Sequence, residues 1–271
     1  MNGASRDAQA AARESLTALT DNTSVDATQL ADELAAVTGL LDREVRLRRV
    51  LADPSRSGEQ KAELVRTVLG DRVGGPTVDL VSGMVRSRWS APRDLVDATE
   101  ELADSADLVA AERAGSLEET EDELFRFSRT VASAPDLRAA LANPSADPEA
   151  KARLVQTLLG GKVRPATERL VTRLVSQPRG RSLEAGIEGL SKLAAERRDR
   201  SVAIVTSAVP LSDQQKERLG SVLARLYGRR MHLNLDVDPE VLGGITVRIG
   251  DEVINGSIAD RLSEAERRMA G

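Results

Sequence analysis

The 271-residue sequence contains no cysteine and only one histidine, His232. The absence of cysteine excludes a disulfide framework, a thiolate nucleophile, an iron–sulfur cluster and cysteine zinc sites. A single histidine excludes multi-histidine metal sites and leaves at most one Ser-His-Asp triad. The residues present therefore offer little material for metal chemistry or covalent catalysis.

Aromatic residues are also scarce, with two Phe, one Trp and one Tyr in the chain. A core must then consist of Leu, Val, Ala and Ile, and with 30% charged residues the composition favours amphipathic helices. No apolar run is long enough to cross a bilayer, and residues 1–25 lack the pattern of a secretory signal. The net charge of −5 argues against a protein that mainly grips phosphate backbones. We expect a soluble, cytoplasmic, helix-rich protein.

An internal duplication is the strongest positive signal. Residues 46–85 align without gaps on residues 136–175, and about half of the aligned positions are identical. The matched pairs include Leu47/Leu137, Pro54/Pro144, Lys61/Lys151, Leu64/Leu154, Gly70/Gly160 and Val85/Val175. The chain therefore contains one helical module twice. We call the bundle around residues 46–85 copy one and the bundle around residues 136–175 copy two.

Each copy shows the apolar periodicity of several helices. In copy one, the apolar stripe from Leu30 to Leu41 predicts a helix that runs toward Leu51 and ends before Pro54. A cap formed by Ser57 and Gln60 predicts a helix that ends at Gly70, and Asp147 with Pro148 predicts the corresponding cap in copy two. Further helices are expected after Pro76 through Trp89, and from Pro92 toward copy two with Leu95 and Leu102 inward. Because the connections are short, we expect successive helices to pack as antiparallel neighbours.

The pattern changes near residue 201. A β-branched run over 201–209 predicts a strand, and Ser212 with Gln215 predicts a capped helix that closes at Gly228. Alternation over 231–237 predicts a second strand, and residues 244–254 predict a hairpin that turns at 250–251. An amphipathic helix over 258–269 would end this part of the chain.

The predicted fold class is mainly α with a small α/β part. We expect two tandem helical bundles, at 1–110 and 111–200, and a C-terminal α/β domain with a β-hairpin at 201–271.

Candidate catalytic residues are few. His232 lies in an alternating strand opposite Met231, Leu233 and Leu235, which is typical of a surface histidine. A triad would need a serine on a strained elbow, and no G-x-S-x-G motif occurs. The C-terminal glycines are separated by strand-like residues, which indicates turns rather than a phosphate loop. We predict no catalytic, cofactor-binding or metal site, no cofactor and no small-molecule substrate.

Without a predicted catalytic site, binding to another chain remains as the expected kind of function. The arginine-rich segments at 196–200 and 229–230 are interpreted as solvated helix ends, because aromatic side chains on which nucleic-acid bases could stack are absent. Two bundles of short Leu/Val/Ala helices could accept an amphipathic helix, which favours an adaptor. An RNA-associated regulatory protein is the alternative, and a hydrolase that uses His232 is a third hypothesis.

The C-terminal stretch resembles a known family. Residues 237–262 read VDPEVLGGITVRIGDEVINGSIADRL, which is similar to the signature of the delta subunit of bacterial F-type ATP synthases. This is the family of the mitochondrial oligomycin-sensitivity-conferring protein. Residues 205–212 and 136–154 resemble the family as well. The signature positions are Asp238, Pro239, Gly243, Gly244, Gly250, Asp251, Ile254, Gly256 and Ser257.

The resemblance implies a non-catalytic peripheral-stalk subunit on the cytoplasmic face of the cell membrane. Such a subunit joins the alpha/beta catalytic head to the b subunits, so that rotor torque is resisted. Its helical domain binds N-terminal segments of alpha, and its C-terminal domain meets the C-terminal ends of b. No nucleic acid and no membrane span are implied. Ordinary members have one helical domain, so we expect alpha to bind copy one or both copies here.

Overall fold

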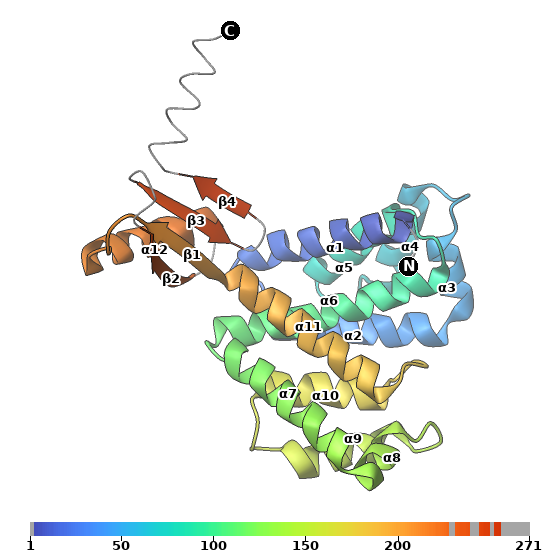
Figure 1. Cartoon of the computed structure of the whole chain (residues 1–271). Helices are drawn as coiled ribbons and strands as arrows, with labels where there is room; N and C mark the ends of the chain where they lie inside the picture. Colours follow the sequence, from blue (N-terminus) through green and yellow to red (C-terminus); the bar gives the residue numbers. More distant parts are fainter. Residues whose placement is uncertain (1–2, 228–230, 239–243, 250–251, 256–271) are drawn as a thin grey trace. The chain divides into compact units, whose positions relative to one another are not determined.

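The computed structural model describes residues 3–227, 231–238, 244–249 and 252–255. The chain divides into two compact units, Met1–Ala194 and Ala195–Gly271, which we call the helical unit and the C-terminal unit. Twelve helices and four strands occur in the described residues (Figure 1), so the predicted fold class is confirmed. The division into three domains at residues 110 and 200 stays a prediction.

The helical unit begins with the helices of copy one. These are α1 (Gly3–Asp21), α2 (Ala27–Arg43), α3 (Val45–Ala52), α4 (Gly58–Leu69), α5 (Gly75–Arg86) and α6 (Pro92–Arg113). The chain continues with α7 (Leu117–Ser133), α8 (Pro135–Ala142), α9 (Pro148–Leu159), α10 (Pro165–Ser176) and α11 (Leu183–Ser201).

Local sequence sets several helix starts. Ser57 and Gln60 form the expected capping box of α4. The Ser57 hydroxyl accepts from the backbone N–H of Gln60, and the side-chain oxygen of Gln60 accepts from the backbone N–H of Ser57. Asp147 caps α9 by accepting from the N–H of Glu149, with Pro148 in the first turn. Asp26 caps α2 by accepting from the N–H groups of Thr28 and Gln29.

The prediction of a single helix from Leu30 to Leu51 is wrong. The helix is interrupted at Glu44, where α2 has ended and after which α3 begins. The Arg48 guanidinium donates to the carbonyls of Leu41 and Asp42, which satisfies the freed end of α2. Copy two breaks at the equivalent Ala134, where the following proline disfavours the α conformation.

Trp89 was expected inside the fifth helix, but α5 ends at Arg86. Trp89 instead lies in the link to α6, where it is buried and its Nε1 donates to the carbonyl oxygen of Met84 at 2.8 Å. The indole therefore caps a backbone carbonyl in the last turn of α5 and does not belong to the apolar face of that helix.

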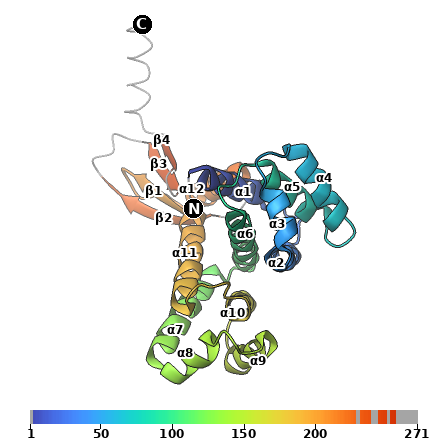
Figure 2. The ribbon, with the colours of Figure 1, turned by 90° about the vertical axis from the view of Figure 1, so that its right-hand side faces the viewer.

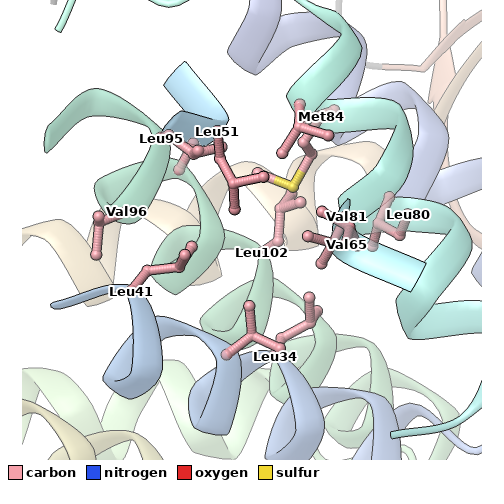
Figure 3. Packing of buried hydrophobic residues seen from close by; sticks show 14 of the residues in the cluster. Leu34, Leu41, Leu51, Val65, Leu80, Val81, Met84, Leu95, Val96 and Leu102 are labelled. Carbon is pink, nitrogen blue, oxygen red and sulfur yellow. The ribbon is translucent and has the colours of Figure 1, made fainter. Parts of the chain in front are cut away.

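The first core is built on α2, α5 and α6 (Figure 3). Its largest fully buried side chains include Leu34, Leu41, Leu95 and Leu102. Packing between successive helices is confirmed for α4 with α5 and for α9 with α10, which lie side by side in Figure 2. Helix α2, however, packs mainly along α6, because its apolar stripe faces that central helix.

Helix α6 belongs to both copies. At the repeat spacing it is the counterpart of α1 in copy two as well as the last helix of copy one, and it packs on α10 as α1 packs on α5. Its residues from Leu95 to Ala106 enter the first core, whereas Leu108 and Ala111 enter the second. The two bundles are therefore joined through a shared helix rather than a linker.

The C-terminal unit contains β1 (Val202–Ser207), α12 (Asp213–Tyr227), β2 (His232–Val237), β3 (Ile245–Ile249) and β4 (Glu252–Asn255). The strand order is β2-β1-β3-β4, with β1 parallel to β2 and antiparallel to β3. Ile249 pairs with Glu252, which confirms the expected hairpin with a two-residue connection. The helix expected over 258–269 lies outside the described residues.

A small core holds the sheet against α12. Ala203, Val205, Leu223, Val247 and Ile249 form its buried centre. Ser212 and Gln215 cap α12 reciprocally, as expected. Among the described residues, no helix combines the length and apolar character needed to cross a membrane.

Candidate interaction site

Three of the nine signature residues fall in the described part of the C-terminal unit. Asp238 follows β2 and its N–H donates to the carbonyl oxygen of Ser207 at 3.0 Å, Gly244 precedes β3, and Ile254 lies in β4 opposite Val247. The other six lie outside the described residues: Pro239, Gly243, Gly250, Asp251, Gly256 and Ser257. The described three thus border one sheet, and a role in partner contact stays a prediction.

Gly244 has a backbone requirement of its own. Its φ is 85°, in the left-handed region that side chains rarely adopt. The residue lets the chain turn directly into β3, which indicates a structural reason for glycine at this position.

His232 opens β2, where it pairs with Val202 in the parallel register. Among the described residues, no group of three or more His, Asp or Glu side chains could hold a metal ion. The expectation that the chain lacks a metal site or a triad stays a prediction.

A repeated polar contact positions the second and fifth helices of each copy. In copy two, a carboxylate oxygen of Glu123 accepts from the N–H of Arg164 at 2.8 Å and from the hydroxyl of Thr167 at 2.6 Å. In copy one, Glu33 accepts from Thr77 at the equivalent place. Each carboxylate lies at a helix N-terminus, where the helix dipole stabilises negative charge.

A groove opens on copy two between α7, α8 and the end of α9. Its volume is about 290 Å³, and we call it the α7–α9 groove. The lining residues are Glu123, Arg126, Phe127, Thr130, Leu137, Leu158, Leu159, Lys162 and Val163. The floor is apolar, whereas both cations lie at the exposed margin. Such a groove suits an apolar side chain of a partner better than a polar metabolite.

The equivalent place in copy one is closed. Its void measures only about 10 Å³ and is lined by Val37, Leu40, Leu41, Leu47, Leu51, Val65, Val68, Leu69 and Val81. Five of these correspond, at the repeat spacing, to lining residues of the α7–α9 groove. Among them, Leu40 corresponds to Thr130. The two copies thus share a backbone module but differ in whether this cleft is filled.

An ion-pair cluster fastens copy two to α6. The Arg173 guanidinium contacts carboxylate oxygens of Asp104 and Asp107, each at 2.6 Å, and Arg169 contacts Asp107 and Asp32 of α2 at the same distance. The Asp107 side chain is 1% exposed, so these charges depend on their arginine partners for stability.

A second group of ion pairs extends the cluster along α6. Arg179 pairs with Glu100 and Asp97, and Arg181 pairs with Glu100 at 2.5 Å. The backbone of Arg179 has a φ of 47°, a left-handed conformation that costs free energy outside glycine. The buried pairing with Glu100 offsets that cost and anchors the loop before α11 to α6.

Burial dominates the titration of one carboxyl group in the cluster. Burial, aided by the nearby carboxylates of Glu100 and Asp107, raises the pKa of Asp104 to about 7, and Arg173 only partly opposes this shift. The group therefore exchanges a proton near neutral pH.

Sequence reasoning missed both the α7–α9 groove and the ion-pair cluster. A signal for the cluster was present, because Asp97, Glu100, Asp104 and Asp107 recur at spacings of three and four along a helix otherwise rich in apolar residues. Arginines at 169 and 173 repeat that spacing on the partner helix. The groove had no comparable signal, because the sequence pattern of its apolar floor residues is the same as that of buried core residues.

Comparison with known proteins places the chain in a family. The sequence profile described as "ATP synthase delta (OSCP) subunit" matches residues 103–269, more than half of the chain. The profile begins within α6, so α1 to α5 lie outside it.

Curated relatives extend over the whole length. The ATP synthase subunit delta of Streptomyces griseus is 69% identical over 271 residues and covers 100% of both chains. That of Streptomyces avermitilis is 71% identical over 269 residues, covering 99% of this chain and 98% of its own. That of Thermobifida fusca is 50% identical and covers 92% of each.

A solved structure also matches. A chain of the Toxoplasma gondii mitochondrial ATP synthase hexamer is 21% identical, with a TM-score of 0.32, over 62% of this chain and 95% of that chain. The matches give no support to an RNA-associated protein. From the profile and the full-length relatives, the chain belongs to the ATP synthase delta (OSCP) family and is a peripheral-stalk subunit of the F-type ATP synthase.

Proposed function

We propose that the chain is a non-catalytic brace that joins the alpha/beta head of the ATP synthase to the b subunits at the cytoplasmic face of the membrane. In this role it resists rotor torque, so that proton flow is coupled to ATP synthesis. The chain itself transforms no substrate.

The shared helix α6 is the observation that carries this proposal. A brace must transmit force without bending, and a flexible linker between two bundles would dissipate it. Here α6 supplies side chains to both cores, and Arg169 and Arg173 tie α10 to it through buried pairs. The helical unit is therefore suited to act as one body.

For the alpha subunit, we propose the α1–α5 face of copy one. The equivalent α6–α10 face of copy two carries Arg169 and Arg173, whose partners reach as far as α2. At the matching positions of copy one stand Asp79 and Gly83, which are exposed. An added Cβ at Gly83 would meet no atom within 4 Å. This face leaves room for a helix from an alpha N-terminal segment.

For the b subunits, we propose the C-terminal unit. Six of the eight large hydrophobic residues that are exposed among the described residues lie there. They are Val209, Val222, Leu226, Leu235, Val237 and Val253. Exposed apolar side chains gathered on a small unit indicate a protein contact, and the C-terminal ends of b are the partners that the family implies.

Reconstitution tests the proposed function. Membrane vesicles depleted of this chain should lose ATP-driven proton pumping, and the purified full-length chain should restore it. The alpha contact is tested by adding an alpha N-terminal peptide to the full chain, with Gly83→Trp expected to weaken binding and Gly189→Trp as the control. Neither glycine has an atom within 4 Å of an added Cβ. Pumping that persists without the chain, or ATP hydrolysis by the chain alone, would refute the proposal.

A further inference from the structure

We propose that the α7–α9 groove of copy two is an additional docking site, for an amphipathic segment of another subunit whose apolar residues are flanked by carboxylates. The inference rests on the proposed function, because it assumes assembly into the complex. It adds a contact at a place distinct from the α1–α5 face and from the C-terminal unit.

The floor of the groove supplies the apolar half of the site. Leu137, Leu158, Leu159 and Val163 are partly exposed around the buried Phe127. The volume of about 290 Å³ lies at the small end of ligand sites, which commonly span about 300–1,000 Å³. It suits a few apolar anchors on one side of a helix rather than a cofactor.

The contrast between the copies shows that the module does not require this opening. Copy one has nearly the same backbone elements, and there Leu40 and its neighbours reduce the void to about 10 Å³. In copy two, the residue at the position of Leu40 is Thr130, which is exposed and leaves the apolar floor accessible. Exposed apolar floor is unfavourable in an isolated chain, so its covering by a partner would recover that free energy.

The charge at the margin defines the partner. Arg126 and Lys162 are exposed, and within the described residues neither has a carboxylate partner. The Lys162 ammonium group donates to the backbone carbonyl of Leu158, at 3.1 Å. The acid at the margin, Glu123, already accepts from Arg164 and Thr167. The groove therefore presents unneutralised positive charge, which complements carboxylates on the segment that binds.

Thiol labelling in the assembled enzyme tests this site directly. The chain has no cysteine, so Thr130→Cys introduces the only thiol into it, at the groove wall. Thr157→Cys is the matched control, because Thr157 is exposed on α9 but does not line the groove. The reaction of Thr130→Cys with a maleimide, followed by mass spectrometry of this chain, should slow about tenfold on assembly, whereas the control should not change.

A benzophenone maleimide attached at Thr130→Cys then identifies the occupant. We expect a crosslinked peptide from another subunit, with carboxylates beside its apolar residues. A crosslink to this same chain or to a second copy would overturn the proposal, as would an absence of crosslinks. Equal maleimide reactivity before and after assembly would overturn it as well.

Charge reversal at the margin gives an independent measurement. Arg126→Glu/Lys162→Glu should abolish most of the maleimide protection at position 130, because the margin would then repel the segment. The control Arg72→Glu/Arg88→Glu makes the same charge change at exposed positions of copy one and should retain protection. Proton pumping in these assembled enzymes separates the outcomes: restored pumping without protection refutes the groove and leaves the proposed function standing.

Discussion

The two helical copies share one module but use it differently. In copy one, the cleft between α2, α3 and α4 is closed, and the buried residues of α3 and α4 are Leu51, Ala52, Lys61, Ala62, Val65 and Leu69. In copy two, the equivalent α8 and α9 bury only Leu141, Lys151 and Val155, and the cleft is open. One backbone can thus serve as a packed support or as an open surface, depending on a few side chains.

Polar contacts divide the copies in a similar way. Copy two reaches α6 through the buried arginines Arg169 and Arg173, whereas copy one has Asp79 and Gly83 at those positions on α5. Charge therefore fixes copy two to the shared helix, while apolar packing between α2 and α6 dominates in copy one.

Breaking the helix that both copies use should destabilise the protein most. Ala103→Pro in α6 should destabilise the fold by at least about 3 kcal/mol, because proline removes a helical hydrogen bond and its ring clashes. Ala12→Pro in α1 is the comparison, since both alanines are buried in mid-helix. Fluorescence of Trp89, the only tryptophan, reports copy one, and hydrogen exchange of α9 and α10 reports copy two.

We expect Ala103→Pro to expose both copies and Ala12→Pro to expose copy one while copy two keeps its protection. If the two variants raise the exchange of α9 and α10 equally, α6 has no special role in joining the copies.

A smaller effect is expected from the ion-pair cluster. Arg173→Ala should cost about 2–3 kcal/mol in the free energy of unfolding, because it leaves the buried Asp104 without its cation and leaves Asp107 with Arg169 alone. Arg153→Ala is the control, because Arg153 is an exposed arginine paired with exposed acids. Denaturant unfolding measures both, and similar losses in the two variants would contradict an essential buried pair.

The pH dependence of stability should reveal Asp104. Its pKa of about 7 in the folded protein lies above its ordinary value of 3.8, so folding takes up a proton between those values. Stability contributed by this group is therefore present below about pH 4, falls as pH rises toward about 7, and is level above that.

Asp104→Asn should remove this decline. The test compares unfolding free energies of the two proteins at a series of pH values, since their difference cancels the other carboxylates. A difference that stays constant between pH 4 and 8 would show that Asp104 remains ionised throughout.

The smallest expected effect comes from converting copy two toward copy one. Thr130→Leu introduces the residue found at Leu40 and should partly fill the α7–α9 groove, which raises stability by about 0.5–1 kcal/mol. The reverse change, Leu40→Thr, should destabilise copy one by about 1–3 kcal/mol. Thermal unfolding of both variants measures the pair, and a Thr130→Leu protein that loses stability would refute equivalence of the two sites.

Sequence patterns predicted the elements whose cause is local. The capping box of Ser57 and Gln60, the cap at Asp147 and the hairpin pairing of Ile249 with Glu252 follow from residue chemistry over a few positions. The break at Ala134 had an unused local signal in Pro135. The break at Glu44 had none, because contacts of Arg48 with the end of α2 support it.

Features that depend on tertiary packing could not be predicted in the same way. Periodicity placed Leu95 and Leu102 inside a helix of copy one, but it could not show that the same helix also carries Leu108 into a second core. The Arg179 contact with Glu100 joins residues far apart in the chain, so no local pattern indicated it. The α7–α9 groove depends on how side chains from three helices fill the space between them, which only the folded structure shows.

The shared helix also has an evolutionary consequence. A tandem fusion of complete six-helix bundles would contain twelve helices before the sheet domain, whereas overlap at α6 reduces that number to the eleven found here. Mutations in α1 or α11 affect the packing of one bundle, but mutations in α6 affect the cores of both bundles and are constrained by both. We therefore expect α6 to diverge most slowly among the helices of related sequences.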